Sequence, residues 1–272
     1  MHAASRDALD QLTRALDSGL EGSGDTVATG LTTGSELFEF TEVLDRERSL
    51  RSALVDTSFT PEQRSGIVTT LVGGSVAPAT AETLKSAVSL TWSTSRDLRT
   101  GLVTLGRRAL LRAAQAQGQL DRVQDELFRL ARIIDGEPQL ELRLADRSAS
   151  PDARRDLLAK VVYGKITAVT EALALQVIGR PQHRPVEDLD ALCDEAAALT
   201  GNDVARVRSA AELNEQQRSS LAAKLETIYG HPITVHTEVD SSLLGGAVIR
   251  VGDEVIDGST AGRLDRLRRS LA

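Results

Sequence analysis

Apolar residues recur at helical spacing along most of the chain, from residue 5 to about residue 200. In the first segment, leucines lie three or four positions apart, so their side chains share one face of a predicted helix. These leucines are Leu9, Leu12, Leu16 and Leu20. Four glycines between residues 22 and 34 then predict a loose connection. A second helix is expected to follow, with its apolar positions beginning at Leu37.

The helical pattern is repeated at a constant offset of ninety residues. Ser5-Arg6-Asp7 recurs as Ser95-Arg96-Asp97, and Glu36-Leu37-Phe38 recurs as Glu126-Leu127-Phe128. The single residues that recur at this offset form the pairs Asp45 and Asp135, Leu50 and Leu140, Leu54 and Leu144, Asp56 and Asp146, Ser58 and Ser148, Pro61 and Pro151, Arg64 and Arg154, Val72 and Val162, Gly74 and Gly164. So many matches at one offset indicate an internal duplication of a helical unit.

The second copy predicts helices near residues 96–117, 120–135, 138–145, 151–163, 166–179 and 186–200. Both copies begin one helix with a hydroxyl residue and a proline, Thr60-Pro61 and Ser150-Pro151, which are the preferred cap and first helical position. Gly73-Gly74 is expected to end the first of these helices. The first helix of the second copy spans the junction, so the two copies are expected to form a rigid pair.

After residue 200 the pattern changes, because alternating apolar and polar residues indicate strands. The elements expected in this tail are a strand at Val204–Val207 with Arg206 and Arg208 facing outward, a helix at Asn214–Tyr229 capped by Asn214, a strand at Ile233–Val239, a hairpin of Ala247–Val251 and Val255–Ile256 around Gly252-Asp253, and a helix at Gly262–Ala272. The predicted fold class is mainly α with a small α/β C-terminal domain, so that two tandem helical bundles precede a small sheet packed with helices. The expected domains are residues 1–105, 106–202 and 203–272.

Composition excludes several classes of function. The 272 residues carry a formal net charge of -7, which argues against nucleic-acid binding because phosphate recognition needs clustered basic residues. Cys193 is the single cysteine, so an intrachain disulfide and a thiolate metal cluster are excluded. The sequence has no signal-peptide core and no apolar run long enough to span a membrane, so any membrane association is expected to go through a partner.

No set of residues predicts an active site, and no cofactor is expected. Gly245-Gly246 precedes a strand, whereas a phosphate-binding glycine loop precedes a helix, so the pair is expected to form a bend. His183, His231 and His236 are expected on the surface without a third metal ligand in reach. Cys193 is expected to be buried and unreactive. The hairpin carboxylates lack the enclosed cleft that acid–base catalysis needs. They are Asp253, Glu254 and Asp257.

The end of the chain combines several arginines with a leucine stripe. The residues concerned are Arg263, Arg266, Arg268 and Arg269, with Leu264, Leu267 and Leu271. Such a helix either binds an acidic partner helix or presents a solvated face. Since no active site is predicted, the residues by themselves indicate a scaffold or adaptor protein.

One stretch of the tail resembles the signature of a known family. The pattern Ile233-x-Val235-x3-Val239-Asp240-x2-Leu243-x-Gly245-Gly246-Ala247-x-Ile249-Arg250-x-Gly252 is similar to that of the ATP synthase delta subunit, whose mitochondrial counterpart is the oligomycin-sensitivity-conferring protein. The likeness continues through Asp257-Gly258-Ser259 and the last helix. The motif residues to which the resemblance gives a structural role are Gly245, Gly246, Arg250, Gly252, Asp257 and Gly258. Residues 106–200 resemble the six-helix domain of the family, and the extra first copy is similar to the longer delta chains of actinobacteria.

This resemblance implies a non-catalytic subunit in the peripheral stalk of the F-type proton-translocating ATP synthase, on the cytoplasmic face of the cell membrane. The helical domain would bind N-terminal segments of alpha subunits, and the C-terminal domain would hold the C-terminal helix of the b subunit, so that rotor torque drives ATP synthesis. The candidate contacts are Leu102, Leu105, Leu110, Val169 and Leu173 for alpha, and Leu264, Leu267 and Arg268 for b. The alternative hypothesis is a freestanding helical-repeat adaptor that binds an amphipathic partner helix; an enzyme is a third.

Overall fold

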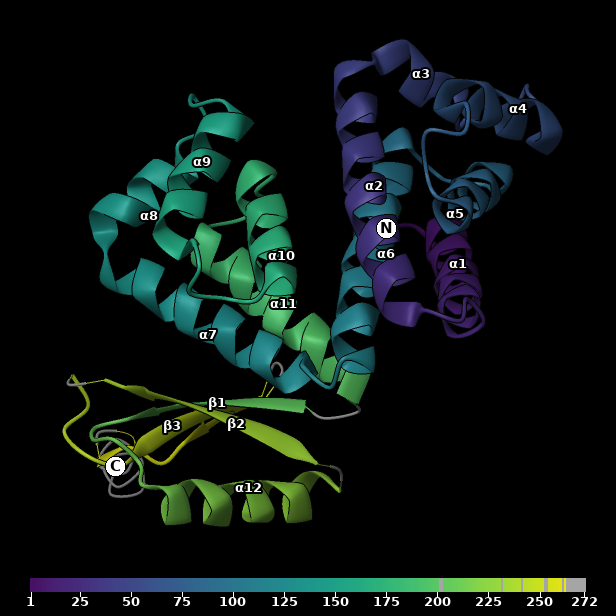
Figure 1. Ribbon diagram of the computed structural model, residues 1–272. Coiled ribbons are helices and arrows are strands. Elements are labelled where there is room, and N and C mark those ends of the chain that lie inside the picture. The colour runs from purple at the N-terminus through teal and green to yellow at the C-terminus, as the bar shows by residue number, and fades with distance from the viewer. Residues whose placement is uncertain (201–202, 231, 241, 252–253, 261, 263–272) are drawn as a thin grey trace, which may run out of the picture. The chain divides into compact units, whose positions relative to one another are not determined.

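The computed structural model describes residues 1–200, 203–230, 232–240, 242–251, 254–260 and 262 (Figure 1). Contacts between residues divide the chain into two compact units. Unit 1 consists of residues 1–123 and 143–182, and unit 2 consists of residues 124–142 and 183–272. The described residues bear out the expected fold class, because helices make up most of the chain and one small sheet lies near its end.

The described helices are α1 (Ala3–Glu21), α2 (Thr26–Arg46), α3 (Arg48–Ala53), α4 (Pro61–Val72), α5 (Pro78–Ser89), α6 (Ser95–Ala116), α7 (Leu120–Gly136), α8 (Pro138–Ala145), α9 (Pro151–Val162), α10 (Ala168–Gly179), α11 (Pro185–Thr200) and α12 (Glu215–Tyr229). The strands are β1 (Asp203–Ser209), β2 (Ile233–Val239), β3 (Ala247–Val251) and β4 (Glu254–Asp257). The helix expected over 262–272 lies almost wholly outside the described residues. The division into three domains stays a prediction, and its first boundary, after residue 105, falls inside the continuous helix α6.

The internal repeat is visible in the positions of the helices. Helices α4 and α5 begin and end ninety residues before α9 and α10. The same contact recurs in each pair: Arg64 Nη2 donates a hydrogen bond to the carbonyl oxygen of Ser89, and Arg154 Nη2 donates one to that of Gly179, each at 3.2 Å. Both carbonyls lie at a helix C-terminus, where the last carbonyls have no partner within the helix. Helix α6 lies about ninety residues after α1 and about ninety residues before α11. It is therefore both the last helix of the first copy and the first helix of the second, and no linker separates the copies.

Helix α2 begins earlier than predicted. Asp25 caps it by accepting a hydrogen bond from a backbone N–H of the first turn at 2.9 Å. Gly30 and Gly34 therefore lie inside a helix, and the loose connection predicted for residues 22–34 is wrong over most of its length. A Cβ on Gly34 would lie 2.6 Å from Cγ of Leu110 on α6. Glycine at this position lets the two helices approach closely. In the sequence, such a glycine cannot be distinguished from one in a loop.

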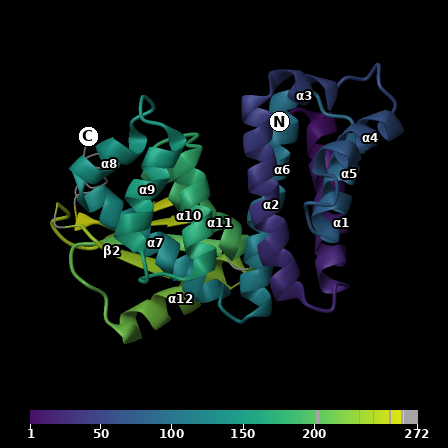
Figure 2. The ribbon, with the colours of Figure 1, turned by 45° about the horizontal axis from the view of Figure 1, so that its top comes forward.

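Helix α6 carries the matching glycine. A Cβ on Gly106 would lie 2.6 Å from Cε1 of Phe38 on α2. The two helices run side by side in both Figure 1 and Figure 2. The core of this part of unit 1 is built mainly from leucines of α1, α2, α5 and α6, which include Leu12, Leu16, Leu20, Leu37, Leu44, Leu84, Leu98, Leu102 and Leu105.

The carboxylate of Asp17 ties α1 to α6. Asp17 accepts hydrogen bonds from Nε of Arg108 at 2.8 Å and from Nε of Arg112 at 3.1 Å. Burial raises the pKa of Asp17, but the hydrogen bonds from the two guanidiniums outweigh burial and lower this pKa to about 2. Asp17 is therefore ionised at neutral pH and can pair with both guanidiniums.

In unit 2, the strand order of the sheet is β2-β1-β3-β4. Strand β1 pairs with β2 in parallel and with β3 antiparallel, and β3 and β4 form the predicted hairpin. Helix α12, which connects β1 to β2, covers one face of the sheet (Figure 1). Asn214 caps α12 as predicted, in a reciprocal capping box with Gln217. The core between α12 and the sheet contains Ala205, Leu225, Ile233 and Val251.

The other face of the sheet carries His236, which contacts helix α7 of the same unit. The His236 ring stacks on Phe128 with 4.5 Å between ring centroids, and the residue is only 7% exposed. The prediction of a surface histidine is therefore wrong, and burial lowers the pKa of His236 to about 4. Arg206 is paired with His236 in the strand register and also faces a helix, since its Nη2 donates to Asp194 Oδ1 of α11 at 2.9 Å. The prediction that Arg206 faces outward is therefore wrong, because α7 and α11 cover the face of the sheet on which it lies.

An arginine of α7 joins three elements of unit 2. Arg132 donates to Asp190 of α11 at 2.9 Å and to Glu238 of β2 at 3.0 Å. Cys193 of α11 is fully buried, as predicted, and burial raises the pKa of its thiol. The tail thus rests on α7 and α11 through one stacked ring pair and a charged network.

Candidate docking surfaces

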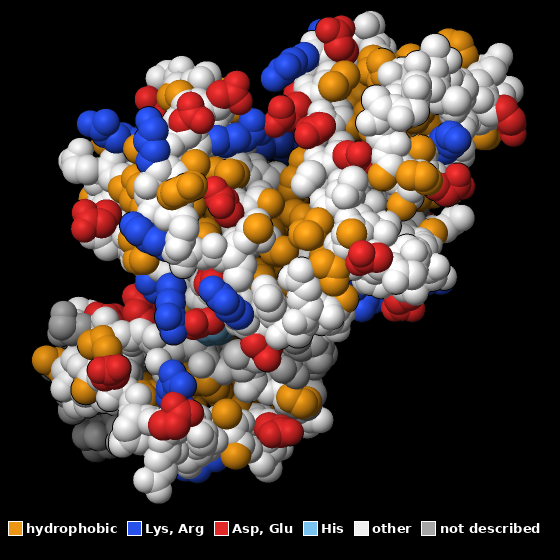
Figure 3. All heavy atoms as spheres, in the orientation of Figure 1, with side chains coloured by type: hydrophobic (Ala, Val, Ile, Leu, Met, Phe, Trp, Pro, Cys, Tyr) orange, Lys and Arg blue, Asp and Glu red, His pale blue; other side chains and the backbone are white. Residues whose placement is uncertain are grey.

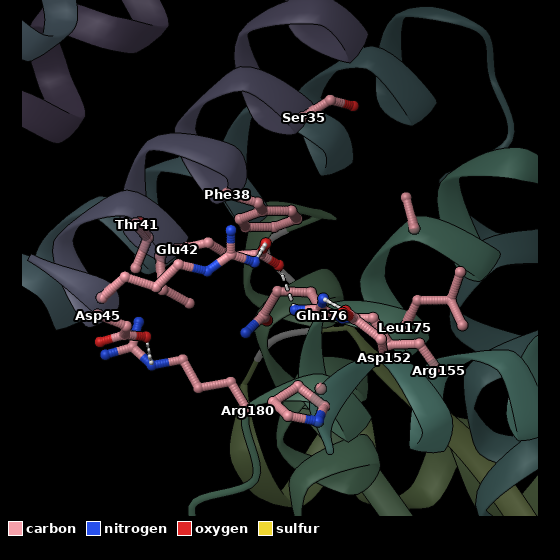
Figure 4. Close-up of a pocket in the computed structure, with 15 residues that line it drawn as sticks. Ser35, Phe38, Thr41, Glu42, Asp45, Asp152, Arg155, Leu175, Gln176 and Arg180 are labelled. Atoms are coloured by element: carbon pink, nitrogen blue, oxygen red, sulfur yellow. Dashed lines mark hydrogen bonds and ion pairs between the residues drawn. The ribbon is translucent and has the colours of Figure 1, made fainter. Parts of the chain in front are cut away.

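A groove with a volume of about 640 Å³ lies in unit 1 (Figure 4). Helix α2 forms one wall, α10 and the start of α9 form the other, and one residue of α6 reaches the floor. The lining residues are Ser35, Phe38, Thr41, Glu42, Asp45 and Arg46 of α2, Val103 of α6, Pro151, Asp152 and Arg155 of α9, and Ala172, Leu175, Gln176, Gly179 and Arg180 at α10.

Apolar side chains form the floor of the groove. Phe38 reaches it because Gly106 of α6 has no side chain beneath the phenyl ring. Val103, Ala172 and Leu175 complete the floor from α6 and α10. Figure 3 shows hydrophobic side chains inside the hollow between α2 and α10, with charged side chains gathered at its upper end. An apolar floor with a charged rim is the usual design of a site that binds an amphipathic partner.

Two ion pairs cross one end of the groove. Glu42 of α2 pairs with Arg155 of α9, and Asp45 of α2 pairs with Arg180 at 3.5 Å (Figure 4). Arg155 fits there because Gly179 has no side chain to collide with its guanidinium. These pairs draw α2 toward α9 and α10, so the groove has a fixed width at this end.

Positive charge is in excess around Asp45. This carboxylate pairs with Arg99 as well as with Arg180. Burial lowers the pKa of Arg180, Asp45 opposes this effect, and repulsion by the guanidiniums of Arg99, Arg107 and Arg96 adds to it. Arg107 Nε donates to Oε1 of Gln176 in the groove wall at 2.8 Å. The Arg180 end of the groove therefore favours an anionic group.

The residues predicted to contact alpha subunits are buried. Each is between 0% and 3% exposed, so none presents surface to a partner in this structure. They are Leu102, Leu105, Leu110, Val169 and Leu173. Their sequence neighbours Val103, Ala172 and Leu175 line the groove instead. Helical periodicity identified the apolar faces correctly, but it carries no information on which of them another helix of the same chain covers.

The glycine pair of the tail permits a close backbone approach. Gly246 has a φ of 79°, and a Cβ there would lie 2.5 Å from the carbonyl oxygen of Gly258. The N–H of Gly258 donates to the carbonyl oxygen of Ala247 at 3.0 Å, and that of Thr260 donates to Gly245 at 2.9 Å. The pair thus allows the start of β3 to lie against the turn that follows β4, and a strand, not a helix, follows it.

The other motif residues divide between turn and surface positions. Asp257 Oδ1 accepts a hydrogen bond from the N–H of Ser259 at 2.9 Å, and Ser259 Oγ accepts one from the N–H of Gly262 at 3.0 Å. Asp257-Gly258-Ser259 therefore forms a turn in which Ser259 caps the residues that follow. Arg250 lies exposed on β3. Four predicted residues lie outside the described residues: Gly252, Leu264, Leu267 and Arg268.

The described residues include no cluster of three or more histidine, cysteine, aspartate or glutamate side chains that could hold a metal ion. His183 is largely exposed as predicted, with Nδ1 3.1 Å from Asp188 Oδ1, whereas His231 lies outside the described residues. Among the helices that the structure describes, none has both the length and the apolar character that a membrane span requires.

Comparison with known proteins identifies the family. The family model for the ATP synthase delta (OSCP) subunit matches residues 108–271. The ATP synthase subunits delta of Corynebacterium jeikeium and Corynebacterium urealyticum are 64% and 62% identical over 272 residues, and the alignment covers 100% of each chain. That of Corynebacterium diphtheriae is 58% identical over 273 residues, again with 100% of both chains covered.

A chain in the Toxoplasma gondii mitochondrial ATP synthase hexamer is 22% identical, with a TM-score of 0.38, over 61% of this chain and 94% of that one. Since the corynebacterial relatives match along the whole chain, the copy that precedes residue 108 is common to them. Members of this family are structural, non-catalytic components of the peripheral stalk of the F-type ATP synthase, and they bind other subunits of that complex. This chain belongs to the ATP synthase delta (OSCP) subunit family, in its long form with a duplicated helical domain.

Proposed function

We propose that this stalk subunit connects the catalytic head to the membrane sector through two docking surfaces. The helical part binds N-terminal segments of alpha subunits, and the C-terminal domain binds the C-terminal helix of the b subunit. The chain then lies on the cytoplasmic face of the cell membrane and is attached only through its partners. The observation that carries this proposal is the groove of unit 1, whose apolar floor and charged rim suit a peptide helix.

The length of the groove agrees with this occupant. Its α2 wall runs from Ser35 to Arg46, which corresponds to about 17 Å at 1.5 Å per residue. Three turns of a partner helix have about the same length, and a terminal segment that folds into such a groove needs no further structure of its own. The surrounding helices are held by buried leucine packing, so the groove is formed before the partner arrives.

For the b subunit, the C-terminal domain offers apolar side chains that its small sheet does not bury. Among its described residues, large hydrophobic side chains between 55% and 84% exposed are Ile228, Val239, Leu244 and Val255. A domain of this size has limited core of its own, and a partner helix packed on such residues removes apolar surface from water. Mechanical coupling requires both attachments at once, because the stalk prevents the head from turning with the rotor.

Two measurements test the proposal. Calorimetry of the full chain with a synthetic peptide of the alpha N-terminal segment should give saturable heat, and absence of heat at high peptide concentration would contradict docking at the helical part. Native purification of the tagged chain should recover alpha and b subunits together. Recovery without either subunit would instead favour a freestanding adaptor.

A further inference from the structure

We infer that the N-terminal copy supplies half of the head-docking site, and that the site takes an amphipathic helix with a carboxylate directed to Arg180. The inference rests on the proposed function, in which a segment of the head docks on the helical part. It assigns a role to the extra copy, which the family model does not match.

The groove belongs to neither copy alone. Its first wall is α2, the second helix of the first copy, and its second wall is formed by α9 and α10 of the second copy. In the ninety-residue repeat, α2 is equivalent to α7, so the pairing of α2 with α10 joins elements of different copies. A chain with a single helical copy would contain the α10 wall but no α2, and the corresponding surface would be open on that side.

The α2 wall is positioned rigidly enough to serve a binding site. Gly34 and Gly106 bring α2 and α6 into close contact, and this places the Phe38 ring over the groove floor. At the charged end, Glu42 and Asp45 hold α2 to Arg155 and Arg180 of the second copy. Apolar packing and ion pairs thus fix both walls, which lowers the cost of ordering them when a partner binds.

The charge of the rim indicates the chemistry of the partner. Arg155 pairs with two carboxylates, Glu42 and Asp152, although Glu42 also pairs with Arg46. In contrast, Asp45 is the one carboxylate among the described residues that pairs with Arg99 and Arg180, and both arginines share it. The Arg180 side chain is 26% exposed, so a carboxylate of a bound helix can reach it. Such a carboxylate would complete a charge-assisted pair in a partly buried position.

The test uses the full chain and calorimetric titration with the synthetic alpha N-terminal peptide. Ser35→Trp places a large ring in the groove from an exposed position of α2, so it blocks the site without disturbing the core. Phe38→Asp removes the apolar floor on the same helix. Each should weaken peptide binding at least tenfold. Val43→Asp is the matched control, because Val43 is exposed on α2 outside the groove lining and should leave affinity unchanged.

The carboxylate is tested by a double-mutant cycle. Arg180→Gln should weaken binding of the unmodified peptide about tenfold, but it should not weaken binding of a peptide whose carboxylates are replaced by amides. Wild-type affinity in Ser35→Trp and Phe38→Asp would overturn the inference while the proposed function stands. Equal effects of Arg180→Gln on both peptides would overturn its electrostatic part. Failure of the peptide to bind the wild-type chain would overturn both the inference and the proposed docking of alpha.

Discussion

Replacing His236 by phenylalanine should remove a pH dependence from the stability of unit 2. The His236 imidazole stacks on Phe128, and its Nε2 is buried without a hydrogen-bond partner among the described residues. A phenyl ring keeps the stacking contact and cannot take up a proton, so the variant tests ionisation alone. The charged groups that act on the imidazole are Asp125, Arg206 and Arg218.

The magnitude follows from the pKa. Burial lowers the pKa of His236 from 6.5 to about 4, and a difference of this size corresponds to about 3 kcal/mol. As the pH falls, the unfolded chain takes up this proton before the folded chain does. The contribution of neutral His236 is therefore fully present above pH 6.5 and is lost progressively as the pH falls to about 4.

The assay is urea denaturation followed by far-ultraviolet circular dichroism, together with hydrogen exchange of the β2 amides, at several pH values between 7 and 4. Wild-type unit 2 should lose about 3 kcal/mol more than His236→Phe over this interval. His183→Gln is the matched histidine substitution, since His183 is largely exposed and does not lie in the contact between the sheet and α7. Parallel slopes for the wild type and His236→Phe, or an imidazole of His236 that titrates near 6.5 in NMR spectra, would refute the reasoning.

Three further substitutions test packing and charge. Asp17→Asn should destabilise unit 1 by about 1–2 kcal/mol at pH 7, after allowance for solvent screening, and the wild type should lose the same amount of stability as the pH falls from about 4 to about 2. Urea denaturation followed by tryptophan fluorescence measures both losses of stability. Equal stability of the two proteins at pH 7 would contradict the prediction. Gly34→Val forces a side chain against α6 and should lower the stability of unit 1 by about 1–3 kcal/mol, as measured by thermal denaturation. Gly66→Ala is the control, because Gly66 lies at an exposed helical position with nothing within 4 Å of the added Cβ, and it should leave stability unchanged or raise it. Gly246→Val should open the β3 turn, because its Cβ would meet Gly258; faster hydrogen exchange in β3 and weaker capture of the b subunit are expected, and an unchanged pull-down would count against that role.

The charged network of unit 2 suits a subunit that bears load. Arg132 holds α11 and β2 together through Asp190 and Glu238, and the pKa of Arg132 is raised because the attraction of these carboxylates outweighs burial. A network of this kind restrains the sheet on its helices in more directions than one ion pair would.

Local structure could be read from the residues because it depends on neighbours in the chain. Hydroxyl residues followed by proline set the starts of α4 and α9, and Gly73 ends α4 in a left-handed conformation. Asn214 opens α12 in the same way. The ninety-residue repeat and the Gly245-Gly246 motif are visible in the sequence without a structure. Fold class and family therefore followed from the order of residues along the chain.

The tertiary structure decided which apolar and polar positions are covered. Gly34 has the composition of a loop residue but packs against α6, and Leu110 has the pattern of a docking residue but is covered by α2. The alternation of β2 places His236 on the face of the sheet opposite to α12, and Phe128 of α7 covers this face. The groove itself combines residues more than one hundred positions apart, such as Phe38 and Leu175. Contacts of this kind depend on how elements pack in space, and the spacing of residues along one element carries no record of its neighbours.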